Sequence, residues 1–427
     1  MAPLIHRPLT ETARIGEDPN LQDYERAGGY RAARKAVLEM TPAEVTGLVK
    51  DSNLRGRGGA GFPTGVKWSL IPMGPEAPRP KYLLVNADEM EPGTFKDRFL
   101  LEGNPHVLIE AVIIAAYATH TDVAYVFLRW AYKLAAKRVQ RAIDEAYAAG
   151  YLGQHIFGSE YGFELYLHMS AGRYICGEET GALNALEGLR ANPRIKPPHP
   201  PQSGVWGRPT TVNNVETFCN VPHIINHGAE WFKSLSWTKD AGTKLYGASG
   251  KVKRPGLWEL PMGTTIREII EDHAGGMQEG LGVRALLPGG ASTEFVLPKD
   301  FDVRMDFDSM ASVRSRMGTG TLIVLDDHTC PVGMVLNLEH FFAQESCGWC
   351  TPCWAGLQWA ETLLRRIENG QGKPGYIDQL EAQTQAIKLG HTFCALAPGA
   401  IEPLQSSLWY FRDDYERHIR EGRCPYE

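Results

Sequence analysis

Three cysteines lie close together in the segment from Glu345 to Cys353, which reads Glu-Ser-Cys-Gly-Trp-Cys-Thr-Pro-Cys. Cys347, Cys350 and Cys353 are each separated by two residues, so one short loop can offer three thiolates to a polynuclear centre. Such runs resemble 4Fe–4S sites, whose fourth ligand then comes from elsewhere, and Cys394 is the candidate. A structural zinc site usually has two C-x2-C pairs, or cysteines with histidines. The pattern therefore favours an iron–sulfur cluster, with zinc or chance thiols as alternatives.

The other cysteines are isolated in the sequence. Isolated thiols are more often small buried apolar side chains than ligands, and this is our interpretation of Cys176, Cys219, Cys330 and Cys424. The uneven spacing of all eight cysteines indicates a metal site in a reducing compartment rather than a disulfide framework. We therefore expect a cytoplasmic protein.

Length and charge narrow the class of protein. The chain has 427 residues and a net charge of -6, without a long basic block, so nucleic acid is not an expected partner. Residues 1–20 lack the apolar core of a secretory signal. The longest apolar run, residues 107–118, contains Glu110 and is shorter than the roughly 20 residues that span a bilayer. We expect no direct membrane insertion, so any membrane association runs through partner subunits.

A glycine-rich loop follows a predicted helix at residues 42–51. It contains Gly56, Gly58, Gly59 and Gly61 and matches the G-x-G-x-x-G pattern, but a Rossmann fingerprint should follow a strand. The glycines still let backbone N–H groups approach an anion closely, and Arg57 and Lys67 add positive charge. We interpret the segment as a phosphate-binding loop of unusual topology; the alternative is a flexible surface loop.

Polar side chains follow a short apolar strand at residues 81–85. They are Asn86, Asp88, Glu89 and Glu91. Ligand-binding residues of open α/β sheets gather where strands end, so this turn is a candidate site, although it could equally be a solvated acidic turn.

Alternating strand and helix patterns continue the chain. Residues 105–118 and 132–149 are predicted helices, and residues 123–130 and 163–169 are predicted strands. This order implies a parallel sheet covered by helices.

A second candidate loop runs from Gly172 to Gly181 and contains Tyr174, Cys176, Gly177, Glu178 and Glu179. Two acids at the start of a helix at residues 182–186 are explained most simply by helix capping. Their glycine and aromatic neighbours also suit the edge of a flavin ring or a nicotinamide carboxamide.

The next segment, residues 192–209, is proline-rich and carries Lys196; it is either a rigid rim around a cleft or a crossover. Residues 210–216 are expected to open a helix that runs to about Asn226. Asn213 and Asn214 are its expected N-caps.

The second half of the chain predicts two smaller folds. Residues 243–325 show a ββαβ order typical of a small ubiquitin-like domain. Four amphipathic helices are expected at residues 332–343, 352–368, 377–389 and 400–421, and a bundle of them could bring both cysteine loops to one end. The predicted domains are residues 1–235, 236–330 and 331–427.

Taken together and in order, the glycine loop, the Asn-Ala-Asp-Glu-Met-Glu-Pro-Gly turn, the Gly-Glu-Glu-Thr-Gly loop and the cysteine motif closely resemble the flavoprotein subunits of bacterial NADH-quinone oxidoreductase, respiratory complex I. The resemblance runs from about residue 20 to the C-terminus. It implies an α/β fold: a modified Rossmann-like FMN domain, then a ubiquitin-like β-grasp domain and a C-terminal four-helix bundle with one 4Fe–4S cluster. It also implies an enzyme that passes a hydride from NADH to FMN and single electrons to the cluster and on towards quinone, without a catalytic acid or base from the protein.

The resemblance also assigns site residues. Four cysteines would ligate the cluster: Cys347, Cys350, Cys353 and Cys394. NADH would contact Phe62, Glu91, Glu179 and Lys196. The residues that would hold FMN are Gly56, Gly58, Gly59, Lys67, Asn86, Asp88, Glu89, Tyr174, Gly177, Glu178, Val212, Asn213 and Asn214. The family can offer aromatic faces where this chain has Leu70 and His199, which leaves the stacking of the adenine open.

The resemblance implies partners as well. They are other iron–sulfur subunits of complex I, including a 2Fe–2S thioredoxin-like subunit, docked near Cys353. The protein would then lie peripherally on the inner face of the bacterial plasma membrane. One alternative is the diaphorase subunit of an NAD-linked hydrogenase or formate dehydrogenase, and another is a zinc-stabilised binding module without flavin.

Overall fold

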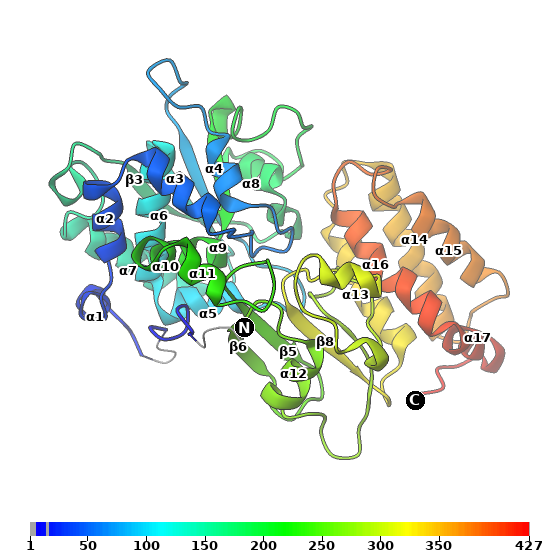
Figure 1. Cartoon of the computed structure of the whole chain (residues 1–427). Coiled ribbons are helices and arrows are strands. Elements are labelled where there is room, and N and C mark those ends of the chain that lie inside the picture. Colours follow the sequence, from blue (N-terminus) through cyan, green and yellow to red (C-terminus); the bar gives the residue numbers. More distant parts are fainter. Residues whose placement is uncertain (1–5, 14–16, 427) are drawn as a thin grey trace. The chain divides into compact units, whose positions relative to one another are not determined.

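The structure is a computed structural model that describes residues 6–13 and 17–426 (Figure 1). The expectation for residues 1–20 falls partly outside this range. The chain forms two compact units. The first contains the described parts of Met1–Met90, with Phe95–Leu245 and Glu259–Gly263, and the second contains Glu91–Thr94, Tyr246–Trp258 and the described part of Thr264–Glu427.

A parallel sheet lies at the centre of the first unit. Its order is β3-β2-β1-β4, and every neighbouring pair is parallel, so the predicted parallel α/β fold is confirmed. Strand β1 carries the consecutive buried residues Leu83, Leu84 and Val85, as expected for a strand covered on both faces. The strands are β1 (Tyr82–Ala87), β2 (Val123–Leu128), β3 (Glu164–Met169) and β4 (Thr210–Asn214).

Helices connect these strands much as the sequence predicts. Helix α6 (Pro105–Thr119) joins β1 to β2, and α7 (Lys133–Ala148) joins β2 to β3. The side chains of α6 are buried along almost its whole length, which identifies it as a core helix of this unit. The glycine loop lies between α3 (Pro42–Asp51) and α4 (Thr64–Ser69), so a helix precedes it, as predicted.

The expectation of a helix from residue 210 was wrong in part. Residues Thr210–Asn214 form β4, because buried β-branched side chains favour an extended strand. Asn214 is nevertheless the N-cap of α9 (Val215–Cys219). The helix then breaks, and α10 (Val221–His227) begins anew, because Pro222 has no N–H to continue the hydrogen-bond ladder.

The second sheet has the order β6-β5-β8-β7. Strand β5 is parallel to β8, and β7 is antiparallel to β8. A short helix, α12 (Ile266–Glu268), continues into a π-turn at Ile269–His273. The strands are β5 (Thr243–Ser249), β6 (Gly256–Pro261), β7 (Val283–Leu287) and β8 (Thr321–Asp326).

Helices complete the second unit (Figure 1). Helix α13 packs against α14 and α16, and α15 packs against the same two helices. The helices are α13 (Pro331–Glu345), α14 (Thr351–Glu368), α15 (Tyr376–Ala386), α16 (Leu396–Tyr410) and α17 (Arg412–Glu421).

The single helix expected over residues 400–421 was wrong, because the chain breaks at Phe411. This residue has a non-helical backbone with φ of -128°. Its buried ring lies edge-on to Phe295, with 5.4 Å between the centroids, and this packing anchors the break between α16 and α17.

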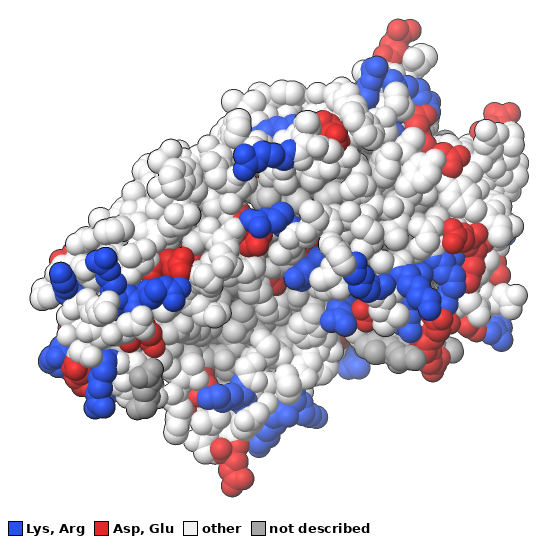
Figure 2. All heavy atoms as spheres, turned by 180° about the vertical axis from the view of Figure 1, so that it is seen from behind, with Lys and Arg blue, Asp and Glu red and all other residues white. Residues whose placement is uncertain are grey.

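No single helix in the described ranges is both long enough and apolar enough to span a membrane. Helix α5 (Lys96–Gly103) and α6 meet that criterion only as a pair, and the two are bent by 99°. On the face drawn in Figure 2, basic and acidic side chains are interspersed.

Candidate functional site

The glycine loop approaches the carboxyl end of the parallel sheet. A Cβ added to Gly58 would lie 3.1 Å from Cβ of Asn214, the last residue of β4. Asn86 pairs with Asn214 across the sheet and lies near the end of β1. Two segments that the sequence predicts to bind FMN are therefore brought together at the edge where ligands of open α/β sheets bind.

Asn214 is the centre of a buried polar network. Its Oδ1 accepts hydrogen bonds from the Glu216 backbone N–H and from Lys96 Nζ, both at 3.1 Å, and its Nδ2 donates to Asp97 Oδ2 at 2.6 Å. Lys96 and Asp97 are both almost fully buried. These hydrogen bonds hold Asn214 in place beside the glycine loop.

The same network contains charged residues that the sequence did not single out. Glu216 is fully buried between Lys96, at 3.1 Å, and Lys244, at 2.6 Å. Burial acts to raise the pKa of Glu216, but the two ammonium groups outweigh it and lower that pKa. Burial of charges is costly unless they are paired, and no local sequence pattern signals pairs so far apart in the chain.

Asn86 connects the turn after β1 to the second candidate loop. Its Nδ2 donates to the Cys176 carbonyl oxygen at 2.8 Å, while its Oδ1 accepts from the Asp88 backbone N–H at 3.2 Å. Asp88 in turn accepts a hydrogen bond from the Ser170 hydroxyl at 2.9 Å, just beyond β3. The segments that follow β1 and β3 are therefore joined by hydrogen bonds.

Glu89 caps a helix. Its carboxylate accepts the backbone N–H groups of Asp97 and Arg98 at 2.9 and 3.1 Å, in the first turn of α5, and the Tyr132 hydroxyl at 3.0 Å. Burial, with the Asp97 carboxylate nearby, raises the pKa of Glu89 to about 7. Through these contacts Glu89 holds the first turn of α5 and the Tyr132 side chain in place.

Four alternating charges lie along the entrance to α8 (Glu179–Leu186). Lys67 Nζ contacts Glu179 Oε2 at 3.0 Å, Lys196 Nζ contacts Glu179 Oε1 at 2.9 Å, and the same ammonium contacts Glu178 Oε1 at 2.8 Å. Lys67 also donates to the Val212 carbonyl oxygen at 3.1 Å. Burial acts to raise the pKa of Glu179, but the Lys67 and Lys196 charges prevail and lower it. Predicted FMN and NADH residues thus share one ion-pair chain.

Glu178 caps the start of α8, which is the simpler of the two interpretations given above for this acidic pair. Its Oε2 accepts the backbone N–H groups of Thr180 and Gly181, at 2.8 and 2.9 Å. Capping and contact with Lys196 use different carboxylate oxygens.

Several features fit a bound flavin nucleotide. A Cβ added to Gly177 would meet no described heavy atom within 4 Å, so there is open space beside the backbone at Gly177. The Phe62 ring is 47% exposed, and Lys67 Nζ lies 6.0 Å from its centroid. Open space beside the backbone, a lysine and an exposed ring suit a phosphate-bearing aromatic ligand. Asn213 is buried and accepts from the Trp68 ring N–H at 3.0 Å.

Glu91 belongs to the second unit and contacts other residues of that unit. Its Oε1 accepts the Ser292 backbone N–H at 2.6 Å, and a Cβ on Gly290 would lie 2.5 Å from its Cγ. Glu91 therefore packs against the Pro288–Ser292 segment within the second unit.

The four predicted cluster ligands gather at one end of the helical part. Cys347 and Cys350 lie between α13 and α14, Cys353 lies in the first turn of α14, and Cys394 lies between α15 and α16. The rings of Trp349 and Phe393, one from each loop, are 6.2 Å apart.

The surroundings of Cys353 raise the pKa of its thiol. Burial raises the pKa of the Cys353 thiol to about 12, a hydrogen bond with Ser346 at 3.1 Å opposes this, and three further thiols add to the rise. Those thiols are Cys347, Cys350 and Cys394. Four sulfur donors from two loops are the donor set that a 4Fe–4S cluster requires.

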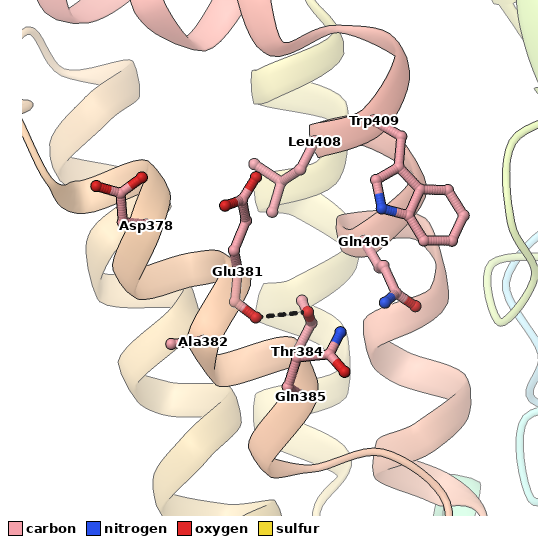
Figure 3. Close-up of a pocket in the computed structure, with 8 residues that line it drawn as sticks. All are labelled: Asp378, Glu381, Ala382, Thr384, Gln385, Gln405, Leu408 and Trp409. Carbon is pink, nitrogen blue, oxygen red and sulfur yellow. Dashed lines mark hydrogen bonds between the residues drawn. The ribbon is translucent and has the colours of Figure 1, made fainter.

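A groove of about 400 Å³ lies between α15 and α16 (Figure 3). Asp378 and Glu381 line one side, and Leu408 and Trp409 line the other. None of its lining residues is a predicted site residue.

A parallel α/β unit with a glycine loop, in one chain with four cysteines grouped at the ends of helices, fits an iron–sulfur flavoprotein. Comparisons with known proteins agree. Residues 49–223 match the "Nuo51 FMN-binding domain", residues 333–418 match the "NADH-ubiquinone oxidoreductase-F iron-sulfur binding region", and residues 248–295 match the "SLBB domain".

Relatives span nearly the whole chain. The F subunit of NADH-quinone oxidoreductase from Salmonella typhimurium is 54% identical over 97% of this chain and 93% of its own, and that of Escherichia coli gives the same values. A crystal structure of an NAD+-reducing [NiFe]-hydrogenase is 32% identical with a TM-score of 0.82, covering 96% of this chain and 68% of the other. The chain belongs to the family of NADH-quinone oxidoreductase F subunits. It is an oxidoreductase with FMN and a 4Fe–4S cluster as cofactors and NADH as substrate.

Proposed function

We propose that this chain is the electron-input subunit of respiratory complex I, which takes electrons from NADH and passes them towards quinone. The observation that carries the proposal is the grouping of four cysteines from two loops, in the same chain as the glycine loop at the sheet edge. Bound FMN supplies an acceptor for the hydride of NADH and, with the cluster, turns a two-electron donor into single-electron steps.

The chain's own residues position the reactants. The glycine loop offers backbone N–H groups, and Lys67 offers positive charge, to the FMN phosphate. The residues proposed around FMN are those predicted from the sequence: Gly56, Gly58, Gly59, Lys67, Asn86, Asp88, Glu89, Tyr174, Gly177, Glu178, Val212, Asn213 and Asn214. Among these residues, Glu89 and Asn214 are proposed to act by positioning, since both side chains hold neighbouring backbone in place.

NADH is proposed to contact Phe62, Glu91, Glu179 and Lys196. Glu179 stays ionised, because its lysine partners lower its pKa, and it can therefore accept hydrogen bonds from hydroxyl or amide groups of the nucleotide. Phe62 offers its exposed ring as a stacking face. Cys347, Cys350, Cys353 and Cys394 are the proposed cluster ligands.

The finer fold assignments are also proposals. The sheet order β6-β5-β8-β7, with β5 and β8 parallel at its centre, supports a ubiquitin-like β-grasp domain. The contacts among α13, α14, α15 and α16 support a four-helix bundle, to which α17 is added. The three matched family regions fall within proposed domains of residues 1–235, 236–330 and 331–427. A modified Rossmann-like form is proposed for the first.

Partner docking is proposed near the cysteines. Trp349 and Trp354 are 58% and 43% exposed there, and exposed aromatic side chains are enriched at protein interfaces. The partner would be an iron–sulfur subunit, with a 2Fe–2S thioredoxin-like subunit among the candidates. Such partners would hold the chain peripherally at the inner face of the bacterial plasma membrane.

The diaphorase subunit of an NAD-linked hydrogenase or formate dehydrogenase is the second candidate. The hydrogenase structure supports it, but its identity of 32% is well below the 54% of the NADH-quinone oxidoreductase relatives. Complex I is therefore the favoured assembly.

An anaerobic titration of the purified chain with NADH tests the function. Absorbance would follow the flavin, electron paramagnetic resonance would follow the cluster, and iron and flavin would be assayed in the same sample. We expect flavin bleaching and a reduced-cluster signal. A colourless chain without iron that does not respond to NADH would refute the proposal. Dithionite serves as a stronger reductant. A cluster signal seen only with dithionite would show that the cluster is bound but is not reduced by NADH.

A further inference from the structure

A second group of potential metal ligands lies in the helical part. Cys330, Glu368, His418 and Cys424 each point one ligand atom into a common centre, and these atoms all lie within 4.8 Å of one another. Cys330 is the N-cap of α13, Glu368 ends α14, His418 lies in α17, and Cys424 follows α17. Three helix ends therefore converge on one point.

The separations among three of these atoms are close to the edges of a tetrahedral zinc site. His418 Nε2 lies 3.2 Å from Glu368 Oε2, and Cys330 Sγ lies 3.4 Å from His418 Nε2 and 3.5 Å from Glu368 Oε2. With ligands about 2.0–2.3 Å from zinc, the edges of a tetrahedron measure about 3.3–3.8 Å. The fourth ligand, Cys424, contacts both Glu368 and Cys330.

Outer contacts orient the ligands. His418 Nδ1 donates to the Asp414 carbonyl oxygen at 2.7 Å, which directs Nε2 towards the other ligands. Histidine ligands of metals usually make such a second contact. The Gly333 backbone N–H donates to Cys330 Sγ at 3.2 Å, which stabilises a thiolate at the start of the 15-residue helix α13.

The contact between His418 and Glu368 must hold either a proton or a metal ion. Because Nδ1 holds the proton of a neutral His418, its Nε2 is an acceptor, and it lies 3.2 Å from another acceptor, a carboxylate oxygen of Glu368. Two acceptors at that distance need a proton or a metal ion between them. His418 is fully buried and Cys424 nearly so, which favours a closed structural site over a solvated one.

We propose that Cys330, Glu368, His418 and Cys424 form a structural zinc site that fastens the end of the chain to α13 and α14. Binding releases three protons to solvent, two from the thiols and one from between His418 and Glu368, and it leaves the imidazole neutral and the carboxylate ionised. The site is separate from the cluster cysteines, which lie at the other end of α14, an 18-residue helix about 27 Å long. It is also independent of the proposed function.

Metal analysis of the full-length chain tests this proposal. The chain and its variants would be purified under reducing conditions, and zinc and iron would be measured in each sample. We expect about one zinc ion per wild-type chain, beside the cluster iron. Cys424→Ser and Cys330→Ser should each lose zinc at least about tenfold and retain iron. The matched control is Cys219→Ser, which alters a buried thiol of the first unit and should retain both metals.

Spectroscopy on the wild-type chain keeps the test decisive if the variants fold poorly. After chelation of zinc from a sample with complete cluster iron, added Co²⁺ should give thiolate charge-transfer and tetrahedral d–d bands, and added Zn²⁺ should raise the Tm and remove those bands. The proposal is overturned by a reduced wild-type chain that holds no zinc and gives no such bands. A disulfide between Cys330 and Cys424, found by mass spectrometry under the same conditions, would overturn it equally.

Discussion

Replacing Asn214 with alanine separates a supporting role from direct flavin binding. The side chain caps α9 and joins two buried charged residues, Lys96 and Asp97. Loss of an N-cap costs about 1 kcal/mol, and loss of each hydrogen bond to a charged group costs about 1.5 kcal/mol at the low end of the usual range. The low end applies because Lys96 and Asp97 also contact each other at 2.7 Å. The expected loss of unfolding free energy is therefore about 4 kcal/mol.

Urea unfolding of the full chain in excess FMN would measure this loss, with flavin content measured at equilibrium. The matched control is Asn20→Ala, since Asn20 caps the exposed helix α1 (Leu21–Arg26) by accepting the Asp23 backbone N–H at 3.0 Å. It should lose only about 1 kcal/mol. If Asn214→Ala were no less stable than Asn20→Ala, the network reasoning would be wrong. Flavin loss at unchanged stability would instead identify Asn214 as a direct ligand.

Four further changes probe the two candidate sites and the packing beside the glycine loop. Cys394→Ser should abolish the cluster while FMN content stays normal, because the two lie in separate units; equal loss of flavin, measured with iron in one sample, would contradict this. Lys67→Ala should weaken FMN retention on a desalting column, and unchanged flavin content would remove this lysine from the site. Glu179→Gln should raise the KM for NADH without changing iron content. The wild-type KM should stay flat between about pH 6 and 8, because the two lysine partners of Glu179 lower the pKa of its carboxyl from an already acidic value. A KM that rises as the pH falls through that range would point to another group. Gly65→Ala should destabilise the fold by at least about 3 kcal/mol in urea unfolding, since its Cβ would lie 2.3 Å from the Lys50 backbone nitrogen, and a stable variant would show that this segment can move.

Local patterns predicted much of this structure. The parallel sheet followed from alternating strand and helix signals, and the cysteine triplet followed from ligand spacing within nine residues. Strand β4 was missed, because a run of only five residues ending in two asparagines also resembles a helix start. The break at Phe411 was missed as well, because it depends on packing against Phe295, which is far away in sequence.

Long-range charge and ligand clusters could not be predicted in the same way. Glu216 and its two buried lysines come from separate segments, and each alone resembles an ordinary surface charge. Cys330 and Cys424 were interpreted as isolated buried thiols, yet the fold brings both of them to Glu368 and His418. Such clusters depend on where helices end in space, which no spacing rule within one segment contains.

The ion-pair chain of Lys67, Glu179, Lys196 and Glu178 has a consequence for how ligands bind. Two positive and two negative side chains give it no net charge, and each lysine already has a carboxylate partner. An incoming phosphate must therefore compete with a carboxylate for each ammonium group, so binding exchanges part of one ion pair for another. Such an exchange changes the charge balance little, and ionic strength should affect nucleotide affinity less than it would at a site of free lysines. The glutamates act as internal counterions that hold the lysines in position. The charge of a ligand alone therefore adds little binding free energy, which favours ligands that make further contacts.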